Sequence, residues 1–289
     1  MSFDLGDQSG RTVIITGANS GLGKETARAF AGSGADVIMA CRNLDKANAA
    51  AAEIGKNARV EQLDLADLAS IRDFAGRVDK ADVLINNAGV MAVPYRKTAD
   101  GFEMQMGTNH LGHFALTLQL LDADKVDDRV VTLSSFMHRM GKLDFNDLDW
   151  SKRRYNRWRA YGDTKLANLM FGKELARRLA AAGSPVTSTI AHPGYADTEL
   201  QGHTESFQDK VMVLGNKILA QSAAAGAWPT EYAAVSPNAV NGGFYGPTGL
   251  GGMQGKPGKS PYRKMVDDQG LRDRLWTVSE ELTGVRSPV

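Results

Sequence analysis

Short runs of hydrophobic residues alternate along the chain with longer stretches in which hydrophobic side chains recur at helical spacing. The short runs are mostly continuous in Val, Ile and Leu, which is typical of strands buried on both faces of a parallel sheet. They lie at 12–16, 36–40, 58–63, 82–86, 129–134 and 186–191. The longer stretches predict helices at 22–33, 45–54, 67–77, 99–122 and 160–182. This alternation predicts an α/β fold with a doubly wound parallel sheet of about seven strands, flanked by helices.

The C-terminal part of the chain departs from this pattern. Residues 242–258 contain eight glycines and two prolines, which predicts irregular backbone rather than a helix or a strand. This Gly-rich segment, taken to about 242–260, and the region at about 195–220 both follow late strands, whose ends normally line a ligand crevice. We therefore expect residues 195–220 to form a substrate loop. A closing helix is predicted at 263–282.

Composition and charge narrow the classes of protein. The 289 residues are 43% hydrophobic and 23% charged, which is typical of a globular protein with a sizeable core. Since 34 Lys and Arg face 33 Asp and Glu, the net charge of +1 argues against a general polyanion-binding surface. With Cys41 alone, neither a disulfide framework nor a cysteine-built zinc site is expected. No hydrophobic run approaches the roughly 18 to 20 residues of a membrane span, and the acidic N-terminus does not resemble a signal peptide. We expect a cytoplasmic protein without an integral membrane segment.

A glycine-rich turn follows the first strand. Residues 16–23 read Thr-Gly-Ala-Asn-Ser-Gly-Leu-Gly and lead into a helix. Glycines allow the backbone to approach a ligand closely, and the N–H groups that begin a helix suit a pyrophosphate. A purely structural turn is the alternative, but the strand before and the helix after favour a nucleotide. We therefore predict a single NAD(P)-binding Rossmann domain over 1–289, with this part of its site formed by Gly17, Asn19, Ser20, Gly21, Leu22 and Gly23.

The ends of the next two strands predict the adenosine side of the site. No Asp or Glu ends the second strand, where a reader of the ribose 2′-hydroxyl is expected; Arg42 stands there, followed by Asn43. A guanidinium fits a 2′-phosphate, which favours NADP(H) over NAD(H), with NAD(H) as the second cofactor. The alternative is a surface arginine at the start of a helix. Asp64, with Leu65, follows the third strand and either meets the adenine amine or caps the next helix.

Tight turns and hydroxyl groups end the later strands at the same edge. The turn after the fourth strand contains residues expected to lie against the cofactor, namely Asn87, Ala88 and Gly89. The fifth strand ends in Ser134 and Ser135, and a serine there either bonds a substrate oxygen or caps a turn. Asn109 stands between two glycines in a long helical pattern, which predicts a kink that frees backbone groups for water and for Lys165.

Tyr161 and Lys165 are four residues apart on a predicted helix and therefore share a face. A free tyrosine has a pKa of about 10. A nearby ammonium lowers the pKa of a phenol by about 1 to 3, which brings it into the range of a general acid or base. Alone, such a pair is usually incidental, so its weight depends on the motifs around it.

Taken together, the motifs are similar to those of the short-chain dehydrogenase/reductase family. The match spans roughly residues 10–200, and in it the glycine turn, the turn at 86–89, Asn109, Ser135, Tyr161 with Lys165, and Pro193 with Gly194 occur in the family's order. Residues 141–148, 165–168 and 192–194 resemble the retinol-dehydrogenase-like branch. One departure is Thr164, which stands where a serine usually precedes the lysine.

The resemblance implies an activity and a role for each residue. Tyr161 would exchange a proton with the substrate oxygen, Ser135 would orient that oxygen, and Lys165 would lower the pKa of the tyrosine and bind the nicotinamide ribose. Asn109 would hold a water that links Lys165 to solvent. Tyr161, Lys165, Pro193 and Gly194 would thus join the cofactor-binding residues.

The implied function is NADP(H)-dependent interconversion of a lipophilic alcohol and its aldehyde or ketone, in a homodimer or homotetramer. The alternative is a catalytically silent NADP(H)-binding sensor, which the intact Ser, Tyr and Lys set disfavours. A basic stretch with aromatic residues at 152–159 resembles a nucleic-acid-binding segment, but it is short and the chain is neutral, so we expect no nucleic acid. The five histidines have no metal-ligand spacing, so no metal is expected either.

Overall fold

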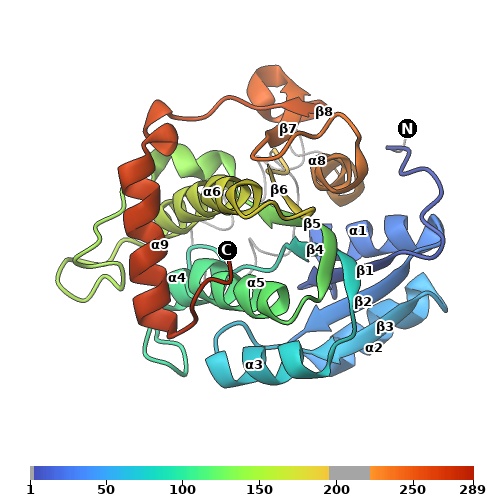
Figure 1. The fold of residues 1–289 in the computed structure, drawn as a ribbon, viewed down its shortest axis with the longest axis horizontal. Coiled ribbons are helices and arrows are strands. Elements are labelled where there is room, and N and C mark those ends of the chain that lie inside the picture. The colour runs from blue at the N-terminus through green and yellow to red at the C-terminus, as the bar shows by residue number, and fades with distance from the viewer. Residues whose placement is uncertain (1–2, 195–221) are drawn as a thin grey trace.

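The computed structural model describes residues 3–194 and 222–289, and the predicted substrate loop at 195–220 lies outside them. A central sheet of eight strands has the order β3-β2-β1-β4-β5-β6-β7-β8 (Figure 1). Every pairing is parallel except that of β8 with β7. The strands are β1 (Thr12–Thr16), β2 (Asp36–Cys41), β3 (Ala58–Gln62), β4 (Ala81–Asn86), β5 (Val126–Leu133), β6 (Thr187–Ala191), β7 (Phe244–Gly249) and β8 (Gln254–Lys259). The doubly wound α/β prediction is confirmed, with eight strands in place of about seven.

Helices cover both faces of the sheet because alternate strand residues point to opposite sides. Ile14 packs into a core with the helices on one face, whereas Val13 and Ile15 pack with those on the other. The first face carries α3 (Leu68–Arg77), α5 (Gly112–Asp122) and α6 (Arg157–Ala181), and the second carries α1 (Gly21–Gly32), α2 (Leu44–Ile54) and α8 (Ala223–Val235). Both cores are apolar, which explains the continuous hydrophobic runs of the strands. Among the described helices, none is both long and apolar enough to cross a membrane.

The helix predicted at 99–122 begins later and is interrupted. Its first turn is α4 (Met104–Met106), which Glu103 caps by accepting bonds from the N–H groups of Gln105 and Met106. Gly101, with a φ of +87°, ends the preceding turn, so the backbone there is not helical. The kink predicted around Asn109 is a π-helical turn (Gly107–Leu111) between α4 and α5.

The prediction of irregular backbone at 242–258 is wrong, because β7 and β8 form an antiparallel hairpin there. The glycines serve close packing: a side chain at Gly246 would run into the ring of His192. Pro257 is tolerated because β8 is an edge strand of the sheet. Short 3₁₀ turns lie at Phe136–Met140, Leu250–Gly252 and Lys264–Asp267.

The closing helix is α9 (Gln269–Thr283), which begins six residues later than predicted because the 3₁₀ turn precedes it. It runs across α6 and α5 (Figure 1). Its Trp276 is buried, stacks on Phe171 of α6 with ring centroids 5.7 Å apart, and meets Phe114 of α5 edge-on at 5.2 Å. The C-terminal helix therefore covers part of the outer face of α5 and α6.

Candidate active site

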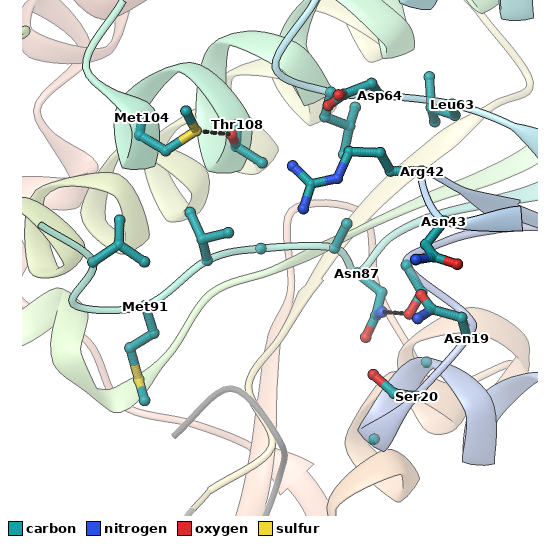
Figure 2. Close-up of a pocket in the computed structure, with 18 of the residues that line it drawn as sticks. Asn19, Ser20, Arg42, Asn43, Leu63, Asp64, Asn87, Met91, Met104 and Thr108 are labelled. Atoms are coloured by element: carbon teal, nitrogen blue, oxygen red, sulfur yellow. Dashed lines mark hydrogen bonds between the residues drawn. The ribbon is translucent and has the colours of Figure 1, made fainter. Parts of the chain in front are cut away.

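A cavity of about 410 Å³ lies beyond the carboxyl ends of β1, β2, β3 and β4 (Figure 2). In a doubly wound sheet this is the edge at which ligands bind. The cavity collects most of the residues predicted to bind the cofactor. They are Gly17, Asn19, Ser20, Gly21, Leu22, Gly23, Arg42, Asn43, Asp64, Leu65, Asn87, Ala88 and Gly89.

The glycine turn gives the cavity a wall of backbone. Gly17 and Gly21 have φ values of +66° and +52°, which L side chains rarely adopt. A Cβ on Gly23 would lie 2.5 Å from the Gly17 carbonyl oxygen and 2.5 Å from Asn87 Nδ2. Ser20, the N-cap of α1, makes no side-chain capping bond, so the side chain leaves the first N–H groups of the helix to a ligand. This turn fits the pyrophosphate of a dinucleotide.

The adenosine side holds an exposed guanidinium. Arg42 follows β2, and its side chain projects into the cavity (Figure 2). Within residues 3–194 and 222–289 it makes no hydrogen bond or ion pair. Asn43 accepts a bond from the Lys46 N–H and caps α2, so the predicted turn into a helix is also present.

Asp64 lines the cavity but does not cap the helix that follows it. Its Oδ1 accepts a 2.9 Å bond from the Ala66 N–H, and its own N–H donates to Ser70 Oγ. The cap of α3 is Asp67, which accepts from the N–H groups of Ala69 and Ser70. Of the two interpretations of Asp64, the helix cap is therefore wrong, and the adenine contact stays a prediction.

The cavity has a further wall that the sequence motifs did not predict. Directly after Gly89 the chain supplies Val90, Met91, Val93, Pro94 and Arg96, while α4 adds Met104 and the π-helical turn adds Thr108. Most of these side chains are apolar, so this wall suits a hydrophobic group. The signal available in the sequence was their position directly after the turn at 87–89.

The catalytic candidates meet where β5 ends beside α6. The Lys165 Nζ lies 5.5 Å from the centroid of the Tyr161 ring, and it donates to the Leu133 carbonyl at 3.3 Å. Both side chains are buried, with 8% of Tyr161 and 5% of Lys165 exposed. The Ser135 side chain is close enough to Tyr161 to act on its pKa through a hydrogen bond. The same hydroxyl accepts a hydrogen bond from the Met137 N–H and so caps a 3₁₀ turn. Ser134 instead donates to the Lys165 carbonyl, which leaves Ser135 as the serine next to the tyrosine.

Burial sets the ionisation of this pair. It raises the pKa of Tyr161 to about 12, against a hydrogen bond with Ser135 that lowers it. It also lowers the pKa of Lys165 to about 8. The expectation that the lysine brings the tyrosine pKa below its usual range is therefore wrong for the protein's own groups. Removing water disfavours the charged form of both side chains, and it is the largest influence on the pKa of each.

The side chain of Asn109 is a clamp rather than a water site. Its Oδ1 accepts from the Val90 N–H at 2.8 Å, and its Nδ2 donates to the Val90 carbonyl and to Thr164 Oγ1 at 2.9 and 3.1 Å. Thr164 in turn donates to the Tyr161 carbonyl. A threonine supplies the hydroxyl that both of these hydrogen bonds use, as the usual serine would. The predicted water would have to use the backbone carbonyl of Asn109.

Gly89 connects the cavity to these catalytic candidates. A Cβ on Gly89 would lie 3.1 Å from Asn109 Oδ1 and 3.8 Å from Lys165 Nζ. The side chains of Ser135, Tyr161 and Lys165 are not among the described residues that line the cavity. The cavity wall at Gly89 nevertheless passes directly beside Lys165, so the two sets of predicted residues adjoin at Gly89.

Pro193 and Gly194 end the described part of the chain after β6. Gly194 has a φ of +69°, and its N–H donates to His192 Nδ1 at 3.2 Å. His192 Nδ1 accepts this bond, so its Nε2 carries the hydrogen and donates to Ser260 Oγ at 2.8 Å. The hairpin end at Ser260 thus orients the residues that precede 195–220, whereas their contact with a cofactor stays a prediction.

Several side chains of the basic stretch at 152–159 contact other residues of the same chain. Arg153 pairs with Asp147 and Asp163 at 3.3 and 3.4 Å and lies over the Trp150 ring at 3.8 Å. The Tyr155 hydroxyl donates to Glu103 at 2.9 Å. Through these contacts the stretch packs against the rest of the chain where α6 begins. In the part of the chain that the structure describes, no group of three or more His, Cys, Asp or Glu could hold a metal ion.

Three comparisons place the chain among known proteins. The family model of the short chain dehydrogenases matches residues 11–209. Retinol dehydrogenase 13 of Homo sapiens is 42% identical, over 96% of this chain and 86% of that protein. A crystal structure of an uncharacterized protein from Mycobacterium paratuberculosis is 46% identical over 100% of both chains, with a TM-score of 0.87.

The fold also recurs in a more distant crystal structure that holds NADP. It is described as an NAD(P)-dependent gluconate 5-dehydrogenase from Beutenbergia cavernae. It is 24% identical, covers 82% of this chain and 95% of its own, and has a TM-score of 0.64.

Proposed function

The chain belongs to the short-chain dehydrogenase family, in its retinol-dehydrogenase-like branch, and is an NAD(P)-dependent oxidoreductase that acts on alcohol and carbonyl groups; from this premise we propose that it uses NADP(H), with Tyr161 as general acid and base. The observation that carries the cofactor proposal is Arg42. It projects into the cavity at the end of β2 without a partner among the described residues, and β2 does not end in an Asp or Glu that would bind a 2′-hydroxyl. A guanidinium binds a 2′-phosphate through forked, charge-assisted bonds.

We propose a lipophilic alcohol and its aldehyde or ketone as substrates. The apolar wall formed by Val90, Met91, Val93 and Pro94 supports this, because it offers a hydrophobic surface next to Gly89 and Lys165. The likeness to retinol dehydrogenase 13 supports the same class of substrate. The substrate loop at 195–220 stays part of the proposal, since it follows Pro193 and Gly194 at the same sheet edge.

The proposed chemistry assigns one task to each residue. A bound nicotinamide ring supplies or accepts the hydride. Tyr161 gives its phenolic proton to the substrate oxygen during reduction and takes a proton from the alcohol during oxidation. Ser135 orients that oxygen by a hydrogen bond. Lys165 and the Asn109 clamp fix the geometry behind the tyrosine, and burial excludes water from the proton transfer.

The direct test is turnover with each cofactor. Purified protein is mixed with NADPH or NADH and a series of aldehydes and ketones of rising chain length, and the loss of nicotinamide absorbance is followed. We expect turnover that is faster with NADPH and that improves as the substrate becomes more apolar. Tight NADPH binding with no turnover across the series would favour the alternative, a regulatory sensor on the same fold.

Assembly and location are also proposals. We propose a homodimer or homotetramer, as the family resemblance implies, with α9 packed over part of α5 and α6 in each subunit. Sedimentation of the purified chain measures this, and a monomer would contradict it. We propose a cytoplasmic location because the single cysteine, Cys41, is buried and unpaired; recovery in a membrane fraction would contradict it.

A further inference from the structure

Two buried histidines follow Asn109 and reach in opposite directions: His110 lies in the π-helical turn and His113 in the first turn of α5. His110 and His113 are each 1% exposed. His113 Nε2 lies 2.9 Å from Thr16 Oγ1, at the end of β1 and directly before the glycine turn. His110 Nε2 lies 2.9 Å from Ser279 Oγ on α9. One histidine therefore contacts the cofactor side of the molecule, and the other contacts the C-terminal helix.

The hydrogen bonds of His113 fix which nitrogen carries the proton. Its Nδ1 lies 3.0 Å from the Asn109 carbonyl, which can only accept, so Nδ1 carries the hydrogen. Burial lowers the pKa of His113 to about 3, so the ring is neutral at physiological pH. Its Nε2 is then an acceptor, and the Thr16 hydroxyl must donate to it. The ring is thus held between two fixed partners.

Because the Thr16 hydroxyl donates its hydrogen to His113, its oxygen can accept two further hydrogen bonds. It accepts from the N–H groups of Asn87 and Ala88, each at 2.9 Å. Within the described part of the chain, the other acceptor near the Thr16 hydroxyl is the Ile85 carbonyl at 3.4 Å, which is a weak alternative. Without the His113 acceptor the hydroxyl would turn, and its lone pairs would no longer face the turn at 87–89.

We propose that His113 is a positioning residue that holds the wall at 87–89 of the cofactor cavity in register with Asn109. Through the Asn109 side chain this register extends to Val90 and Thr164, and Gly89 in turn lies beside Lys165. The inference rests on the proposed cofactor site. It adds a residue that has no contact with the cavity yet sets the shape of its wall.

The test compares His113→Gln with His113→Asn. A glutamine amide reaches as far as Nε2 and keeps an acceptor for Thr16, whereas an asparagine amide reaches only as far as Nδ1 and leaves Thr16 without one. NADPH affinity is measured by fluorescence titration, without any turnover. We expect His113→Asn to weaken binding about tenfold, the loss of one hydrogen bond. We expect His113→Gln to stay within about twofold to threefold of the unmodified protein.

His110→Asn is the matched control, because His110 is equally buried, lies in the adjoining π-helical turn and bonds to Ser279 on α9 rather than to Thr16. We expect a lower unfolding temperature in both asparagine variants, and weaker NADPH binding only at His113. Equal NADPH affinity in His113→Asn and the unmodified protein would overturn the proposal. An equal loss of affinity in all three variants would also overturn it, since that is the result of loosened packing.

The Thr16 variants test the route through Thr16 without any change at His113, and a double-mutant cycle then combines the two positions. Thr16→Val removes the hydroxyl with little change of shape, and Thr16→Ser retains it. We expect NADPH binding to be weaker in Thr16→Val and close to that of the unmodified protein in Thr16→Ser. His113→Asn should then add little to Thr16→Val; fully additive losses would overturn the proposal. If the unmodified protein binds neither NADPH nor NADH, it is the proposed function that fails, which separates the two outcomes.

Discussion

The two ends of the site are built on opposite physical principles. At the glycine turn the walls are backbone, and the charged group, Arg42, is exposed and has no partner in the described chain. At the catalytic end Tyr161, Lys165 and Asn109 are buried and held by hydrogen bonds. The open end suits recognition of a polar, charged ligand, whereas the dehydrated end suits proton transfer, which water would disturb.

This difference teaches that burial works against the charge state that the residue types alone imply. The attraction between a phenolate and an ammonium favours ionisation, but burial moves the pKa of Tyr161 up and that of Lys165 down. We infer that affinity resides mainly at the open end and rate mainly at the buried end. Variants at the two ends should therefore separate binding from turnover.

The largest effect is expected at Tyr161. Tyr161→Phe removes only the hydroxyl, so turnover should fall about 10³-fold, in the range of a lost general acid or base. NADPH affinity should stay within about threefold, because the ring and its packing remain. Steady-state kinetics and fluorescence titration measure the two quantities. Turnover at the original rate would remove Tyr161 from the chemistry and break the comparison.

The next effect concerns stability and pH at Lys165. Burial lowers its pKa to about 8 in the folded chain, against an ordinary value of 10.5 for a lysine. Below pH 8 both states hold the proton and the penalty for burying the charge is complete; stability then rises as pH rises from 8 to 10.5. Lys165→Met should therefore raise the free energy of unfolding by about 3 kcal/mol at neutral pH and by little above pH 10.5.

Urea unfolding across this pH range measures the difference between the two proteins. Lys46, which is exposed on α2, gives the matched control, because Lys46→Met removes one charge without relieving burial. A difference between Lys165→Met and the unmodified protein that does not change with pH would contradict the burial penalty. The buried end of the site would then owe its character to packing alone.

The smallest of the three effects is expected at the open end. Arg42→Ala should weaken NADPH binding about tenfold or somewhat more, the loss of a charge-assisted hydrogen bond, and leave NADH binding nearly unchanged. Arg286, which is largely exposed near the C-terminus, provides the control for removing one positive charge. Parallel loss of affinity for both cofactors would refute a 2′-phosphate contact at Arg42.

The sequence predicted the parts of the fold whose signal is local. The strands at the centre of the sheet are buried on both faces, so their hydrophobic runs are continuous and easily located. The ends of elements were harder to predict. β5 begins at Val126. The sequence pattern placed its start at 129 because Asp127 and Asp128 interrupt the apolar run. Those two carboxylates pair with Lys80 and Arg11 at the surface, which the linear pattern does not contain.

The parts that escaped prediction depend on contacts between distant residues. The hairpin of β7 and β8 forms from a Gly-rich segment, and the absence of a side chain at Gly246 leaves space for the His192 ring. The role of His113 likewise follows from its distance to Thr16, nearly a hundred residues earlier. A helical pattern shows that such a histidine is buried, but its hydrogen-bond partners are set by tertiary packing.

The two outer strands of the sheet have a consequence for the chain in a crowded solution. On one side β3 presents Arg59 and Glu61, and on the other β8 carries Pro257 between glycine and lysine neighbours. Charged side chains and a missing amide proton make both margins poor templates for a foreign strand. No further strand is therefore expected to add to either edge of the sheet. Concentrated protein should resist aggregation through strand pairing, even though the interior strands are hydrophobic and rich in β-branched residues.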